Sequence, residues 1–214
     1  MITVEKGILE GYKGSNVPYS FLKQESSSKV AVIFPGQGYT NQAPLLYYST
    51  SLLVSEGYHV LHMNYQYHTE PYTSFSDEEK KACIRYNAEK AFTEILSQTD
   101  FSELLILGKS IGTASIASIL GKLTENTKVV WLTPLLTRDE TFHAMMDWNG
   151  PSLSIIGDED PIYRSERWKE LEEKANYKTK LYSGADHSLD LKNKPVESIQ
   201  LMEKVIQTIK EFLQ

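Results

Sequence analysis

A serine between two glycines is the first place in this chain where residue types and spacing could do chemistry. The segment 108–112 reads Gly-Lys-Ser-Ile-Gly; it directly follows the apolar run Leu104–Leu107 and precedes a stretch rich in small residues. A strand, a tight glycine turn and a closely packed helix can lift a serine hydroxyl clear of a sheet, where it can act as a nucleophile. The alternative is a strand-to-helix turn with a chemically silent serine. The context favours Ser110 as a nucleophile.

A nucleophilic serine needs a base, and the base needs a carboxylate that fixes its tautomer. Two later strand ends supply both residue types. The run 152–156 is followed by a turn that contains Asp158, Glu159 and Asp160, and the strand expected near 178–182 is followed by Asp186 and His187. Asp186 is a poor partner because it neighbours the histidine in sequence. The chain order of serine, acid and histidine indicates acyl transfer, with the acid to be chosen among the first three carboxylates.

These segments, taken in order, resemble the motifs of the α/β-hydrolase superfamily, and the resemblance covers nearly the whole chain. In that family the acid commonly ends a Gly-x-x-Asp turn, which implies Asp160, and the base commonly ends a Gly-x-x-His turn, which implies His187. Asp158 and Glu159 would then solvate or cap the turn. The resemblance is to a small, capless, esterase-like branch with Ser110, Asp160 and His187 as the catalytic residues.

Attack on a carbonyl also needs donors for the developing oxyanion. The backbone N–H of Ile111, directly after the nucleophile, is one candidate. The loop after the strand that ends at Phe34 reads Pro-Gly-Gln-Gly, and Gln37 takes the position of the second donor. Relatives often carry His-Gly at the start of this loop, and Pro35 departs from that pattern without removing a backbone donor. A phosphate-binding loop is the rival interpretation, but the segment lacks the Gly-Lys-Ser/Thr ending and the dinucleotide spacing.

The substrate side is less well defined. Where many relatives insert a cap domain, only about residues 137–150 separate two predicted strands, so a cap is absent or reduced to one short helix at 140–147. Tyr39, Tyr65 and Leu135 follow strand ends and are predicted to bind substrate. An amphipathic, fairly open rim of this kind suits a small or medium acyl group.

The remaining reactive side chains are expected to be structural. The ammonium of Lys109 could contact a substrate carboxylate or pair with an acid, but we expect it in solvent. Cys83 is the only cysteine, which excludes an internal disulfide and a cysteine-built zinc site. No His-Glu-x-x-His motif is present, and neither a metal nor a cofactor is predicted. Packing or surface positions are expected for the other histidines, His59, His62, His68 and His143.

Apolar runs alternate with amphipathic stretches, and this alternation predicts the elements that position the site. Strands are expected at 29–34, 58–63, 103–107, 128–132, 152–156 and 178–182, and helices at about 43–56, 77–98, 111–123, 140–147, 165–175 and 196–212. Asp77 is a plausible N-cap of the second helix. Residues 2–25 read as an exposed antiparallel meander. The pattern predicts an α/β fold with a mostly parallel sheet covered on both faces, and ligands bind beyond the carboxyl ends of such strands.

Composition limits the partners. A chain of 214 residues fits one domain spanning 1–214. The net charge of −6 argues against a nucleic-acid or anionic-membrane partner. No apolar run approaches the ~18–20 residues of a spanning helix. The start of the chain lacks the basic and apolar segments of a secretory signal, so a cytoplasmic location is expected. Oligomeric state is not indicated.

Together these observations predict a serine hydrolase that acts on a small-molecule substrate without a cofactor. The expected reaction is that of a carboxylesterase on small or medium acyl esters, through an acyl-enzyme on Ser110. A thioesterase or peptidase with the same three residues is an alternative, because fold does not choose among these reactions. A non-catalytic binding protein that has kept the fold is another.

Overall fold

One mixed sheet organises the chain. The computed structural model describes residues 1–96 and 99–214. Its eight strands lie in the order β1-β2-β4-β3-β5-β6-β7-β8. β1 and β2 form an antiparallel hairpin, and β2 is antiparallel to β4. The strands β3 to β8 are all parallel to one another. Their bounds are β1 Ile2–Glu10, β2 Asn16–Gln24, β3 Lys29–Phe34, β4 Tyr58–Met63, β5 Glu103–Lys109, β6 Lys128–Leu132, β7 Ser152–Gly157 and β8 Tyr177–Tyr182. The predicted mostly parallel α/β sheet is confirmed.

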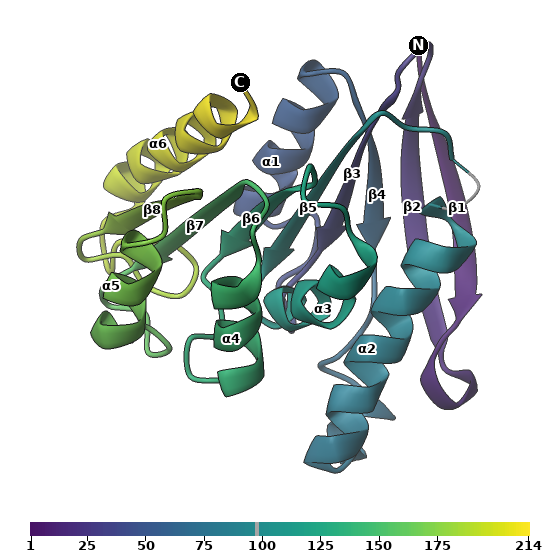
Figure 1. The fold of residues 1–214 in the computed structure, drawn as a ribbon, viewed down its shortest axis with the longest axis horizontal. Coiled ribbons are helices and arrows are strands. Elements are labelled where there is room, and N and C mark those ends of the chain that lie inside the picture. Colours follow the sequence, from purple (N-terminus) through teal and green to yellow (C-terminus); the bar gives the residue numbers. More distant parts are fainter. Residues whose placement is uncertain (97–98) are drawn as a thin grey trace.

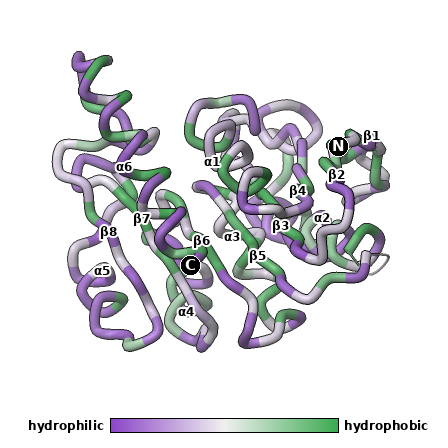
Figure 2. The backbone as a smooth tube through the Cα atoms, turned by 90° about the horizontal axis from the view of Figure 1, so that it is seen from above, coloured by the Kyte–Doolittle hydropathy of each residue, from purple (hydrophilic) through white to green (hydrophobic). Residues whose placement is uncertain are grey.

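Helices cover both faces of this sheet (Figure 1). The helices are α1 Pro44–Ser55, α2 Asp77–Glu94, α3 Ile111–Ile119, α4 Asp139–Asp147, α5 Ser165–Glu172 and α6 Pro195–Leu213. α1 and α6 pack on one face, and α2 to α5 on the other. Alternate residues of a strand pack into the hydrophobic cores on opposite faces of the sheet. In β5, Leu105 and Leu107 face α1 and α6, whereas Leu104 and Ile106 face α2 and α3. Seen from above, β5 and β7 are apolar and lie between the helical layers (Figure 2).

The N-cap of the long second helix lies one residue before the predicted cap. Ser76, not Asp77, is the N-cap: its hydroxyl accepts from the Glu79 N–H, and the Glu79 carboxylate accepts from the Ser76 N–H at 2.9 Å. Asp77 is the first helical residue, where its charge favours the helix dipole. The helix ends at Glu94, and the predicted end at Gln98 lies outside the described residues.

The small-residue helix is shorter than predicted. α3 ends at Ile119 and a 3-10 turn, Leu120–Lys122, follows in place of continued α-helix up to residue 123. Between β6 and β7 the described chain contributes only α4, so no cap domain covers the sheet there. In the part of the chain that the structure describes, no helix has both the length and the apolar character needed to cross a membrane.

Candidate active site

The end of β5 and the start of α3 form the turn that carries Ser110. The backbone of Ser110 has φ 52° and ψ −117°, a conformation that non-glycine residues adopt rarely. Two neighbours hold it there: the Ser110 N–H donates to the Leu132 carbonyl at 3.0 Å, and the Thr113 hydroxyl donates to the Ser110 carbonyl at 2.6 Å. The local structure therefore keeps the serine in a sharp, strained turn.

The two glycines of the motif allow backbones to touch beside this turn. A Cβ on Gly108 would lie 2.6 Å from the carbonyl oxygen of Gly112. A Cβ on Gly112 would overlap the carbonyl group of Phe34 at the end of β3. A side chain at either position would therefore clash with backbone atoms. This contact also brings the start of α3 against the loop that follows β3.

Three side chains from distant segments form one line of hydrogen bonds. The Ser110 Oγ lies 2.9 Å from His187 Nε2, and His187 Nδ1 lies 2.8 Å from Asp160 Oδ2. The Asp160 side chain is fully buried, whereas that of His187 is 35% exposed. The predicted serine, histidine and acid are thus brought together at the carboxyl ends of β5, β8 and β7.

The carboxylates in the loops around His187 accept hydrogen bonds from backbone N–H groups. Asp160 uses its second oxygen to accept from the Ile162 N–H at 2.9 Å. Asp158 accepts from the Gly184 N–H at 2.6 Å and so ties the two loops together. Asp186 accepts from the N–H groups of Ser188 and Asp190. Among the predicted acids, Asp160 is the one that reaches the imidazole.

The loop after β3 approaches the serine from the other side. A Cβ on Gly36 would lie 3.6 Å from Ser110 Cβ, and the Gly36 N–H donates to the Tyr39 carbonyl at 3.1 Å. Gln37 is exposed in the bend of this loop. Ile111 is the first residue of α3, so its N–H has no acceptor within the helix. Both predicted oxyanion donors lie on backbone segments that adjoin Ser110.

The predicted substrate-binding residues occupy different places. Leu135 lies beside the serine turn, with its N–H 3.3 Å from the Thr113 hydroxyl. Tyr39 is half-buried, and its hydroxyl accepts from the Leu45 N–H at the start of α1. Tyr65 is buried, and its hydroxyl donates to the Pro35 carbonyl at 2.7 Å. We therefore correct the expectation for Tyr65: its polar end supports the loop after β3 and is not presented to substrate.

Lys109 also departs from its predicted position. Its ammonium does not reach solvent, because the side chain is only 1% exposed. The Nζ donates to the His187 carbonyl at 3.0 Å and to the Thr133 hydroxyl at 3.3 Å. Burial lowers the pKa of Lys109 to about 8, although the charges of Asp160 and Asp186 act in the opposite direction. The alternation Leu105, Leu107, Lys109 along β5 is a sequence pattern that indicates burial of Lys109.

Two further reactive groups are buried in other parts of the fold. Cys83 is buried in α2, and burial raises the pKa of its thiol to about 11. His62 is buried beside the Thr50 hydroxyl, 2.8 Å away, and burial lowers its pKa to about 4. Each of these two groups is thereby held in its neutral form at pH 7. His59 is half-buried, and His68 and His143 are exposed.

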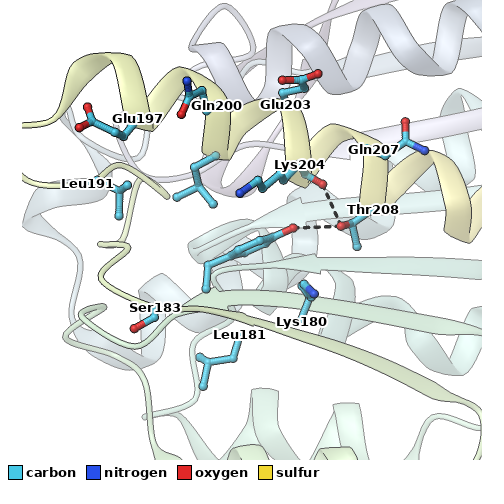
Figure 3. Close-up of a pocket in the computed structure, with 12 residues that line it drawn as sticks. Lys180, Leu181, Ser183, Leu191, Glu197, Gln200, Glu203, Lys204, Gln207 and Thr208 are labelled. Carbon is cyan, nitrogen blue, oxygen red and sulfur yellow. Dashed lines mark hydrogen bonds between the residues drawn. The ribbon is translucent and has the colours of Figure 1, made fainter.

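A groove between β8 and α6 does not belong to the site (Figure 3). Its lining is mostly polar, and two of its hydroxyls are paired within the groove: Tyr182 with Thr208 at 3.0 Å, and Thr208 with the Lys204 carbonyl at 2.8 Å. The predicted site residues are not among the described residues that line it. The carboxyl ends of β5, β7 and β8 therefore remain the candidate site.

Solved structures of other proteins share the fold of this chain. An α/β hydrolase of unknown function from Agrobacterium tumefaciens has a TM-score of 0.76 at 19% identity, with 98% of this chain and 96% of that chain covered. A Pyrococcus furiosus esterase has a TM-score of 0.72 at 16% identity, with coverage of 99% and 92%. A serine hydrolase without a lid from Xanthomonas campestris has 0.69 at 16%, with coverage of 98% and 93%. These likenesses concern the fold.

Sequence comparison gives the family. No curated protein matches the chain. The family described as alpha/beta hydrolase domain matches residues 28–214, which include every strand from β3 to β8 and all three residues of the hydrogen-bonded line. This chain therefore belongs to the alpha/beta hydrolase domain family.

Proposed function

We propose that the protein is a serine hydrolase that cleaves small or medium acyl esters through an acyl-enzyme on Ser110. One observation carries the proposal: the hydrogen bonds from Asp160 through His187 to Ser110. The likeness to an esterase from Pyrococcus furiosus supports an ester as the bond that is cleaved. We also propose that residues 1–214 work as one domain.

The proposed chemistry assigns one step to each group. His187 Nε2 takes the proton of the Ser110 hydroxyl as Oγ attacks the ester carbonyl, and later returns it to the leaving alkoxide. Asp160 holds the tautomer in which Nδ1 carries a proton and stabilises the imidazolium that forms. The N–H groups of Ile111 and Gln37 stabilise the oxyanion, and water activated by His187 then releases the acid.

A fluorophosphonate probe tests the nucleophile. We expect the wild-type protein to become labelled, and Ser110→Ala to remain unlabelled although it is folded by circular dichroism. Ser51→Ala is the matched control, because Ser51 is an exposed serine of α1 whose hydroxyl donates only to the Tyr47 carbonyl. A folded wild-type protein that resists the probe would refute the proposal and favour a binding protein. A panel of p-nitrophenyl esters and acyl thioesters of increasing length then identifies the acyl group.

The acid is tested by a pair of substitutions in one turn. Asp160→Asn leaves the histidine without its carboxylate, and we expect kcat to fall by roughly 10⁴. Asp158→Asn is the matched control, since this residue accepts only from the Gly184 N–H, and we expect kcat to change by less than about tenfold. A larger loss at Asp158 than at Asp160 would show that the acid has been misassigned.

A further inference from the structure

A buried lysine adjoins the proposed nucleophile, and the reaction described above gives it no task. Lys109 is the last residue of β5, and its side chain follows Leu105 and Leu107 onto the sheet face covered by α1 and α6. In the part of the chain that the structure describes, no carboxylate lies within 4.0 Å of its Nζ. The ammonium is therefore enclosed without an ion-pair partner.

Neutral groups from the loops around Ser110 surround the ammonium instead. The His187 carbonyl, in the loop after β8, accepts at 3.0 Å, and the Thr133 hydroxyl, directly after β6, accepts at 3.3 Å. The ring centroid of Tyr39, in the loop after β3, lies 4.5 Å from Nζ. One side chain thus joins the strand that carries the nucleophile to the segments that carry the base, the Leu135 turn and the oxyanion loop.

The acceptors themselves are held by the protein. The Thr133 N–H donates to the Ile155 carbonyl at 2.7 Å, and Thr133 has a φ of 43°. The hydroxyl of Tyr39 is fixed by the start of α1, and its carbonyl accepts from the Gly36 N–H. Thr133 and Tyr39 thus have further hydrogen bonds of their own, and the His187 segment is the part that the ammonium most directly restrains.

Burial of a charged side chain costs desolvation free energy. Replacing buried charged groups by apolar side chains of similar volume is often neutral or stabilising, so packing alone does not explain an ammonium here. A carbonyl and an aromatic face are, however, groups that bind a cation better than a neutral amine. The groups around Lys109 are therefore suited to a charged ammonium, although its burial opposes the charge.

We propose that Lys109 is a positioning residue whose charged ammonium holds the His187 backbone and the Tyr39 ring against the nucleophile strand. The proposal rests on the proposed function of Ser110. Loss of the proton weakens the bond to the His187 carbonyl and the contact with the ring, so the base moves away from Ser110 Oγ. The consequence is an alkaline limit on activity that belongs to Lys109.

The phenol of Tyr39 does not produce this limit itself. The groups that face the ammonium from the surrounding loops are Tyr39, Asp160, Asp186 and His187. Burial raises the pKa of Tyr39 above its usual value of 10.0, so this phenol stays protonated as Lys109 titrates. Burial lowers the pKa of Lys109 to about 8, which puts the expected loss of activity between about pH 7 and 9.

The test measures the rate of fluorophosphonate labelling and of p-nitrophenyl ester hydrolysis from pH 6 to 10. In the wild type we expect both rates to fall above about pH 8. In Lys109→Met we expect this fall in rate above pH 8 (the alkaline limb) to disappear. We expect its kcat at pH 7 to be about 10- to 100-fold lower than that of the wild type, with KM within about twofold. In Lys109→Arg, which stays charged throughout, the limb also disappears. Lys122→Met, at an exposed lysine, should match the wild type.

Stability separates this effect from alkaline unfolding. Between pH 8 and 10.5 the unfolded chain binds more protons at Lys109 than the folded chain does, so its contribution to the unfolding free energy rises with pH. As the pH rises from 8 to 10.5, we therefore expect activity to fall while the unfolding free energy of the wild type rises relative to that of Lys109→Met. If the rate of Lys109→Met is lower but its alkaline limb persists, the lysine is only structural and the proposal is wrong. An unchanged rate and profile overturns it equally.

Amide hydrogen exchange tests the proposal independently of activity. We expect the amides of residues 184–190 to exchange faster in Lys109→Met than in the wild type, because the restraint on the His187 carbonyl is gone. Equal protection in the two proteins would refute the role of Lys109. A wild type that resists the probe at every pH would refute the function of Ser110 instead, so the two failures are distinguishable.

Discussion

The turn that carries Ser110 and the loop after β3 meet at Ser110, but they are held in place in different ways. The turn depends on backbone touching backbone, at Gly108 against Gly112 and at Gly112 against Phe34. The loop depends on side chains that reach it from elsewhere, chiefly the Tyr65 hydroxyl on the Pro35 carbonyl. Steric contact tolerates no added atom, whereas a hydrogen bond can be removed at a moderate cost. The first region should therefore fail in stability and the second in activity.

Gly112→Ala tests the first half of this comparison and should have the larger effect. The new Cβ overlaps the Phe34 carbonyl, which is backbone and cannot turn aside. We expect the free energy of unfolding, measured by urea denaturation, to fall by about 3 kcal/mol. Gly121→Ala is the matched control, because a Cβ there meets nothing within 4 Å, and we expect a change within about 0.5 kcal/mol. Equal stability of the two variants would break the comparison.

Tyr65→Phe tests the second half and should have the smaller effect on stability. It removes the bond to the Pro35 carbonyl and leaves the ring stacked on Tyr67, so we expect a loss of about 1 kcal/mol in unfolding free energy. Because the proposed Gln37 donor is then less firmly placed, kcat should fall about tenfold, less than the ~10²–10³ that follows removal of an oxyanion donor. Tyr182→Phe removes a comparable hydroxyl bond in the groove beside α6 and should leave kcat unchanged. Equal kcat values for the two variants would count against a supporting role for Tyr65.

The sequence predicts what depends on strand ends and glycine spacing. Strands with near-continuous apolar runs could be located, and the residues after them are in fact gathered at one edge of the sheet, which is why Ser110, Asp160 and His187 could be named together. Side-chain direction was less accessible. Tyr65 follows a strand as Tyr39 does, and nothing in the residues shows that its hydroxyl turns inward to a carbonyl.

Lys109 shows a second reason for error. Its charge suggested solvent, while its place in the alternation of β5 indicated the core, and the core position holds because a carbonyl, a hydroxyl and a ring accept the ammonium. Those acceptors come from segments far apart in the sequence, so no local pattern announces them. The N-cap at Ser76 is a smaller case, since Ser76 and Asp77 are both good caps and only the reciprocal bond with Glu79 decides.

The position of the proposed base at the border of the sheet also has consequences for synthesis of the chain and for local unfolding. β8 is the last strand of the sheet and pairs only with β7, and His187 follows it 77 residues after Ser110 in the chain. During synthesis the serine turn is complete long before its base emerges. In the mature protein, fraying of this border separates the imidazole from the hydroxyl while the centre of the sheet stays intact, because border elements open at lower free energy than central ones. If the proposed function is correct, we expect turnover to respond to opening of β8 before the centre of the sheet unfolds.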